Sequence, residues 1–238
     1  MRVPGWSAIA RAWTRRGNPP DRGTADAALA RIADKLRRAR QADLRPFGCE
    51  AHGLRLRPPL APEAVAKVEA RLGVDLPAEY RAFITRVGDG GAGPAYGLFP
   101  LETALARSDA GRVPDLLRTP FPHRAHYDPD RDPAVLRYYD RADAGAVAED
   151  EADLYDLRLR AGTLALCDEG CGYLHFLVVA GPARGTLWID ARCGDGGYGP
   201  LGVTFLEWYE RWLDDTLAGG RGTWWMGPAM YPPGATPA

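Results

Sequence analysis

Long apolar segments are missing from this chain of 238 residues. No run approaches the roughly 20 apolar residues that a membrane-spanning helix needs. The first apolar stretch contains Arg11 and is a poor match to a signal peptide. We therefore expect a cytoplasmic protein without a membrane partner. Lysine is scarce too: Lys35 and Lys67 leave nearly all positive charge to arginine, which suits the recognition of carboxylates and phosphates.

The signatures of the common enzyme classes are also absent. The chain has no G-x-x-x-x-G-K-[ST], G-x-G-x-x-G, G-x-S-x-G or H-E-x-x-H pattern. The glycine-rich residues 194–197 lack the lysine and the following helix that a phosphate-binding loop requires. Asp168 and Glu169 are adjacent, whereas a general acid–base pair converges from separate elements. We expect no catalytic residues and no enzymatic activity.

Cysteine is limited to four positions: Cys49, Cys167, Cys171 and Cys193. Zinc sites usually combine two closely spaced pairs, and this chain offers one. His123 and His126 lie in a proline-rich loop without a helix to fix their spacing, and His175 lies within an apolar strand. We expect reduced thiols, no metal and no cofactor. An open alternative is a small-molecule or metal site built from Cys167, Cys171 and His175.

Charge is distributed unevenly along the chain. Residues 1–45 carry 11 basic and 4 acidic side chains, a net charge of +7, which leaves −8 for the remainder. A basic N-terminal segment therefore precedes an acidic body. In the helix predicted after Thr24, no interleaved aromatics and no groove-reading motif accompany the basic residues, so nucleic acid is not the expected partner. An acidic body suits a basic protein partner, because opposite fields speed encounter.

Helical periodicity dominates the first hundred residues. Thr24 or Asp26 is placed to cap a helix with an apolar stripe at Leu29, Ile32, Ala33 and Leu36. Its opposite face is basic and expected to be solvated: Arg31, Lys35 and Arg38.

Two further helices are predicted to form a helical hairpin. Pro62 suits the first turn of one helix, and Gly73 is placed to end it. Pro77 then starts the second helix and Gly88 stops it. A short strand at residues 96–99 and another helix follow.

The last hundred residues indicate a sheet and a closing helix. Alternation at residues 164–166, a turn at 168–170, and strands at 173–180 and 186–189 predict an antiparallel meander. Thr204 and Glu207 form a capping box. The helix after it has an apolar face expected to be buried: Phe205, Trp208, Tyr209, Trp212 and Leu213.

Three motifs occur in order along the chain. The first is Leu-Pro-x-x-Tyr-x-x-Phe at residues 76–83, followed by a glycine-rich break and Leu-Phe-Pro-Leu at 98–101. The second is Asp-Glu-Gly-Cys-Gly at 168–172, and the third is the aromatic helix at 205–213. In this order they resemble the SMI1/KNR4 family of the SUKH superfamily, over residues 54–217. Asp89 stands where the family commonly has asparagine.

The resemblance implies an α+β fold. It predicts a single SUKH-like domain with a mostly antiparallel mixed sheet and helices packed around it. We divide the chain into a basic extension with one helix at residues 1–50, the domain at 51–218, and a Trp-rich tail at 219–238. Residues 108–160 are interrupted by prolines and are interpreted as an insertion with one or two short elements.

The resemblance also implies a function. Bacterial members are commonly immunity proteins that bind and neutralise a cognate toxin of a polymorphic toxin system, and fungal members are regulatory scaffolds. We expect a bacterial, non-enzymatic protein-binding domain whose partner is a basic toxin domain. The alternative is an intracellular regulatory scaffold. No oligomeric state is predicted. The candidate partner-binding residues are acidic: Glu149, Asp150, Glu151, Asp153, Asp168 and Glu169.

Overall fold

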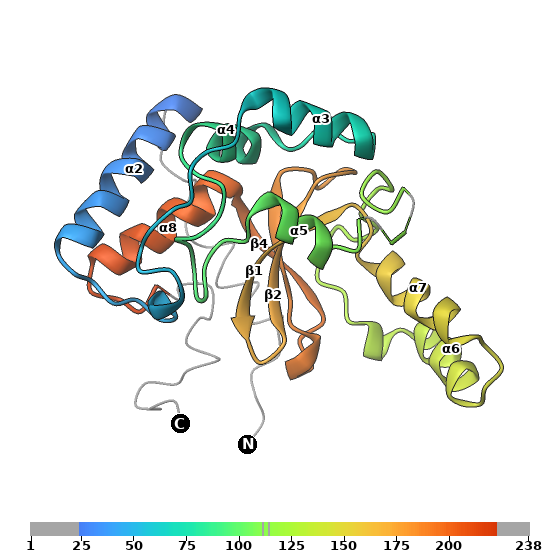
Figure 1. The fold of residues 1–238 in the computed structure, drawn as a ribbon. Coiled ribbons are helices and arrows are strands. Elements are labelled where there is room, and N and C mark those ends of the chain that lie inside the picture. Colours follow the sequence, from blue (N-terminus) through green and yellow to red (C-terminus); the bar gives the residue numbers. More distant parts are fainter. Residues whose placement is uncertain (1–23, 111, 114, 223–238) are drawn as a thin grey trace, which may run out of the picture.

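The computed structural model describes residues 24–110, 112–113 and 115–222. In this part of the chain seven α-helices surround one four-stranded sheet, which confirms the α+β fold (Figure 1). Residues 1–23 of the basic N-terminal extension and residues 223–238 of the Trp-rich tail lie outside the described residues, so the expectations for these segments are not tested.

The sheet is a simple meander. Its strands are β1 (Thr163–Gly170), β2 (Tyr173–Val178), β3 (Thr186–Asp190) and β4 (Tyr198–Thr204). They lie side by side in chain order, and each pair is antiparallel. The predicted meander is therefore confirmed.

The turn between β1 and β2 is displaced from its predicted position. Asp168 pairs with Leu174 and Gly170 with Tyr173, so β1 continues through the residues expected to form the turn. The chain reverses at Cys171 and Gly172, which both have positive φ, as a two-residue hairpin turn of the primed type requires. The prediction of a turn at residues 168–170 was wrong because pairing with β2 extends the strand.

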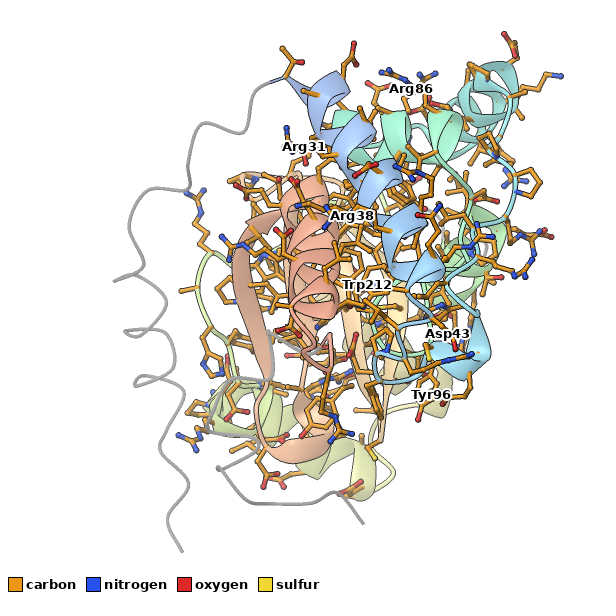
Figure 2. All side chains as sticks on the ribbon, turned by 90° about the vertical axis from the view of Figure 1, so that its left-hand side faces the viewer. Arg31, Arg38, Asp43, Arg86, Tyr96 and Trp212 are labelled. Carbon is orange, nitrogen blue, oxygen red and sulfur yellow. The ribbon has the colours of Figure 1, made fainter. Side chains whose placement is uncertain are left out.

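Helix α2 (Ala25–Gln41) packs along α8 (Phe205–Leu217) as part of the main core. Thr24 is its N-cap, as predicted, and its hydroxyl accepts from the Ala27 N–H. Three residues of the predicted apolar stripe of α2 are buried, Leu29, Ile32 and Leu36, whereas Ala33 is exposed. Figure 2 shows α2 and α8 side by side, with the fully buried Trp212 between them.

The basic face of α2 is only partly solvated, in contrast to the prediction. Arg31 donates to both carboxylate oxygens of the buried Glu210 on α8, at 2.8 and 3.1 Å. Lys35 donates to the same carboxylate at 2.8 Å and forms a second ion pair with Asp214. Ion pairs as well as apolar contacts therefore join the N-terminal helix to the domain.

The predicted helical hairpin is formed by α3 (Pro62–Leu72) and α4 (Ala78–Arg86). Gly73 ends α3 in the left-handed conformation, with φ of 64°, as expected. Phe83 of α4 contacts Phe205 and Tyr209 of α8, with ring centroids 5.2 and 4.7 Å apart. This contact places the hairpin on the aromatic face of α8.

The chain between α4 and the sheet is held by buried polar contacts. The strand expected at residues 96–99 is reduced to a bridge between Gly91 and Leu98. Gly97 interrupts extended structure with φ of 101°, and a Cβ there would lie 2.4 Å from the Gly91 carbonyl oxygen. Asp89 is buried and accepts from the Leu101 N–H at 2.8 Å, at the start of α5 (Leu101–Arg107).

Both faces of the sheet are covered. On one face, Leu177 and Ile189 belong to the main core with α4, α5 and α8. On the other face, Phe176 and Trp188 form a second cluster with Phe121, which comes from the insertion. One function of residues 108–160 is therefore structural, because they cover a sheet face.

The rest of the insertion forms a second helical hairpin. Helices α6 (Pro133–Asp143) and α7 (Glu149–Leu159) contact each other and project from the body (Figure 1). Short 3-10 turns at Cys49–Ala51, Pro129–Arg131 and Arg192–Gly194 complete the described secondary structure.

Candidate functional site

Aromatic stacking holds the projecting α6–α7 hairpin together. Tyr138 of α6 and Tyr155 of α7 stack with their ring centroids 3.9 Å apart. Asp132 caps α6 by accepting from the Ala134 N–H at 2.8 Å, and it also accepts from the Tyr127 hydroxyl. The two helices therefore behave as one unit.

A polar network joins this hairpin to the sheet. Arg192, just after β3, donates to Asp156 of α7 at 2.6 Å and to Asp190 at 2.8 Å. The Tyr139 hydroxyl of α6 donates to the same Asp156 carboxylate at 3.2 Å. The guanidinium also lies 4.9 Å from the centre of the Tyr198 ring. The position of the hairpin is thus fixed before any partner binds.

Four of the predicted partner-binding residues lie in the first turns of α7: Glu149, Asp150, Glu151 and Asp153. Glu151 is exposed, and the side chains of the other three lie outside the described residues. Carboxylates near a helix N-terminus are favoured by the helix dipole, so their positions also have a structural reason. On α6, Leu136 is 41% exposed, which is unusual for a large apolar side chain in this structure.

The other two predicted residues lie elsewhere, on β1. Asp168 is half-buried and accepts from the Gly170 N–H at 2.7 Å. Glu169 is 4% exposed, so the expectation that it contacts a partner at a hairpin tip is wrong for this structure. Alternation along the strand turns its side chain inward, because β1 does not end before it.

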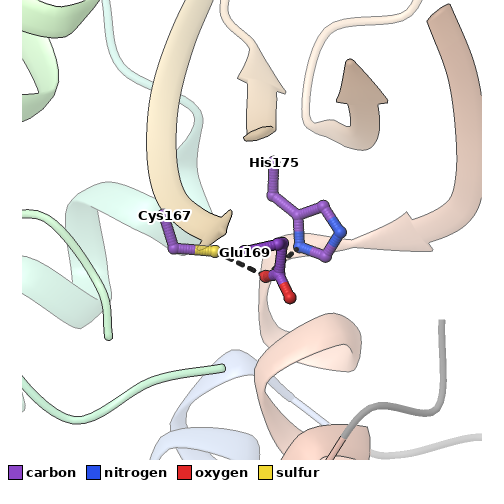
Figure 3. A group of neighbouring side chains, drawn as sticks. All are labelled: Cys167, Glu169 and His175. Atoms are coloured by element: carbon purple, nitrogen blue, oxygen red, sulfur yellow. Dashed lines mark hydrogen bonds and ion pairs between the residues drawn. The ribbon is translucent and has the colours of Figure 1, made fainter. Parts of the chain in front are cut away.

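The buried carboxylate of Glu169 meets two other reactive groups (Figure 3). Its Oε1 atom lies 3.2 Å from Cys167 Sγ and 3.2 Å from His175 Nδ1. The Trp208 indole N–H donates to the same His175 Nδ1 at 3.2 Å. All three side chains of the cluster are buried. Burial lowers the pKa of His175 to about 3, and burial raises the pKa of the Cys167 thiol.

Glu169 is the member of this cluster that sequence reasoning missed. The alternative considered there combined Cys167 and His175 with Cys171, but Cys171 is exposed in the turn. The signal that would have found Glu169 is the two-residue spacing from Cys167, which places both side chains on one face of an extended strand.

The other histidines and cysteines lie outside this cluster. His123 Nε2 lies 2.7 Å from the Leu159 carbonyl oxygen, and His126 Nε2 lies 2.7 Å from that of Gly196. Cys49 is buried and Cys193 exposed, and both are free thiols. Within the described ranges, Cys167, Glu169 and His175 are the one group of three or more such ligands whose atoms converge.

A basic pocket of about 500 Å³ lies between the end of α2 and the loop that follows it. Its wall contains four arginines: Arg37, Arg40, Arg45 and Arg55. Two of these guanidinium groups have acidic neighbours, since Arg37 pairs with Asp34 and Arg45 with Asp43. Asp43 is labelled beside this end of α2 in Figure 2. The sequence did not predict this pocket.

Comparison with known proteins gives one match. Residues 59–211 match the family model described as the SMI1 / KNR4 family (SUKH-1). No curated protein and no solved structure matches the chain. In the described part of the chain, no helix has the length and apolarity required to cross a bilayer. The matched segment includes α3, α4, α5, the whole sheet and most of α8. The chain therefore belongs to the SMI1/KNR4 family.

Proposed function

We propose that this chain is an immunity protein that binds and neutralises a cognate toxin, and that the acidic start of α7 contacts the toxin. SUKH proteins are typically protein-interacting and generally non-enzymatic, which supports a binding role. The observation that carries the proposal is that a helix whose first turns contain four acidic residues belongs to a hairpin that projects from the body.

The hairpin has several properties of a preorganised interface. The bond from Arg192 to Asp156 and the Tyr138–Tyr155 stack hold it in place, so little ordering entropy is lost on binding. Tyrosine is enriched at protein interfaces, and exposed Leu136 adds apolar surface. A cluster of carboxylates would steer a basic toxin toward this surface. Asp168 on β1 remains a candidate contact, whereas Glu169 is too buried to be one.

Capture of the partner from the native host tests this proposal. The tagged protein is compared with a variant whose α7 carboxylates are neutralised: Glu149→Gln, Asp150→Asn, Glu151→Gln and Asp153→Asn. We expect wild type to capture one basic protein. The amount captured should fall at high salt, because screening weakens exposed charge pairs. The α7 variant should lose most of this capture, as judged by mass spectrometry of the eluate.

A matched control removes the same charge from exposed positions on other surfaces: Glu50→Gln, Glu63→Gln, Asp75→Asn and Glu102→Gln. It should retain the partner, because the total charge changes equally but α7 is intact. Equal capture by wild type and the α7 variant would contradict the proposed interface. Capture of many unrelated proteins would contradict the immunity role.

The pocket lined by arginines favours a second function, that of a regulatory scaffold. Arg40 and Arg55 lie in its wall, and a basic pocket suits an acidic segment of a partner. A scaffold of this kind would bind through α2 and not through α7. The double variant Arg40→Ala/Arg55→Ala in the same capture experiment separates the two functions. If this variant loses the partner while the α7 variant still captures it, the scaffold function is supported.

A further inference from the structure

We propose that Cys167, Glu169 and His175 form a buried structural site for a divalent metal ion of the zinc class. The proposal concerns the interior of the sheet and differs from the absence of metal expected from the sequence. It does not depend on the interface proposed on α7, so a negative result for one proposal leaves the other untouched.

Strand pairing brings the three ligands to one place. Cys167 and Glu169 are two residues apart on β1, and Cys167 is the direct partner of His175 on β2. Residues two apart on a strand share a face, and paired residues of adjacent strands lie on that same face. The backbone therefore presents a thiol, a carboxylate and an imidazole to one point next to α8.

The ligand atoms lie at distances close to those around a tetrahedral ion. Zinc bonds of about 2.0–2.3 Å place two ligand atoms roughly 3.3–3.7 Å apart. Glu169 Oε1 lies 3.2 Å from Cys167 Sγ and 3.2 Å from His175 Nδ1, and all three atoms lie within 4.8 Å of one another. Shifts of a few tenths of an ångström would accommodate an ion.

The imidazole of His175 presents one ring nitrogen to the cluster. Nδ1 lies 3.2 Å from Glu169 Oε1 and 3.2 Å from the Trp208 indole nitrogen. An imidazole nitrogen has a single in-plane lone pair, so an ion bound at Nδ1 would replace the hydrogen bond from Trp208. Without an ion, the Cys167 thiol donates to the Glu169 carboxylate at 3.2 Å.

The chemistry of the ligand set also fits zinc. Thiolate, imidazole and carboxylate are the three protein ligands that zinc combines in its sites. A divalent ion with one thiolate and one carboxylate gives a neutral cluster, which suits the fully buried position of the three side chains. Hard ions such as Mg²⁺ prefer oxygen ligands, so the thiolate would disfavour their binding.

The ion would join β1 and β2 next to their turn. Strand β2 packs against α8 at this end through Trp208, which contacts the His175 ring at a centroid distance of 5.7 Å. Because the ligands are fully covered, the ion would enter during folding and not by exchange through the surface.

Metal content and a cobalt spectrum test the proposal on the full-length protein. The protein is produced in medium supplemented with Zn²⁺ or with Co²⁺ and is then passed through a chelator-containing column. We expect retention of about one ion per chain by elemental analysis. The cobalt form should show a thiolate-to-cobalt charge-transfer band and the intense visible bands of tetrahedral cobalt.

Variants assign the thiolate to one cysteine. Cys167→Ser should abolish the charge-transfer band, whereas Cys171→Ser/Cys193→Ser, which removes the two exposed thiols, should retain it. If Cys167→Ser fails to fold, the cobalt spectra of the wild type and of the double variant still test the proposal. Metal-free wild type from both media would overturn the proposal and leave a buried hydrogen-bonded cluster. Loss of the band in the double variant would also overturn the proposal, because the metal would then be bound by the exposed thiols.

Discussion

Glu210 illustrates, at the residue scale, how the N-terminal helix is coupled to the domain. Burial acts to raise the pKa of this carboxyl group, but hydrogen bonds and charges from Arg31 and Lys35 outweigh burial and lower the pKa to about 2. In the unfolded chain the group titrates near its model value of 4.5. The carboxylate therefore stabilises the fold above about pH 4.5, and this contribution is lost as the pH falls toward 2.

Glu210→Gln should lower the free energy of unfolding by about 2 kcal/mol at pH 7, because it removes one partner from a buried charge network. The difference from wild type should fall to less than half at pH 3, measured by urea denaturation at both pH values. Asp214→Asn is the matched control, since Asp214 also pairs with Lys35 but its side chain is 47% exposed. It should cost well under 1 kcal/mol. An equal loss for Glu210→Gln at both pH values would contradict the pKa argument.

Local sequence signals predicted several of the helix boundaries. Thr24, Gly73 and the Thr204–Glu207 capping box lie where the sequence placed them, because caps depend on the residue itself and its neighbours. The Glu207 carboxylate accepts from the Thr204 N–H at 3.0 Å, as the motif requires. The predicted aromatic face of α8 is likewise fully buried.

Features that depend on pairing between distant residues were not predicted. Asp168 to Gly170 has the composition of a turn, but β2 pairs with it and moves the turn to Cys171 and Gly172. Glu210 has no local signal for burial, because α2 covers it from 175 residues away along the chain. The arginine-lined pocket also requires the end of α2 to meet residues 53–55.

At the scale of elements, Asp156 is the main polar connection between the α6–α7 hairpin and the sheet. Asp156→Asn should weaken the bond from Arg192 while leaving the pair between Arg192 and Asp190 intact. We expect faster amide hydrogen exchange in residues 133–159 with a loss of global stability below about 1 kcal/mol, because the ion pair is partly exposed.

Hydrogen exchange followed by mass spectrometry reports both effects of this change. Asp140→Asn is the control, because Asp140 lies on the exposed surface of α6. Unchanged exchange in the hairpin of Asp156→Asn would show that aromatic packing alone fixes its position. Partner binding should also weaken in this variant, because a less ordered hairpin loses more entropy on binding.

At the scale of the whole molecule, the charges are separated between two surfaces. The basic pocket lies at the end of α2, and the acidic run lies on α7 of the insertion. Part of the excess positive charge of residues 1–45 is used inside the protein, since Arg31 and Lys35 pair with α8. Family membership supports a protein partner.

Neutralisation of a toxic partner is the central claim, and co-expression measures it directly. The partner recovered by capture is expressed from an inducible promoter in a heterologous bacterium, alone, with this protein, or with the α7 variant. We predict that the partner alone stops growth, that co-expression of wild type restores growth, and that the α7 variant restores it poorly. A partner that leaves growth unchanged when expressed alone, or whose toxicity this protein does not relieve, would contradict the immunity role.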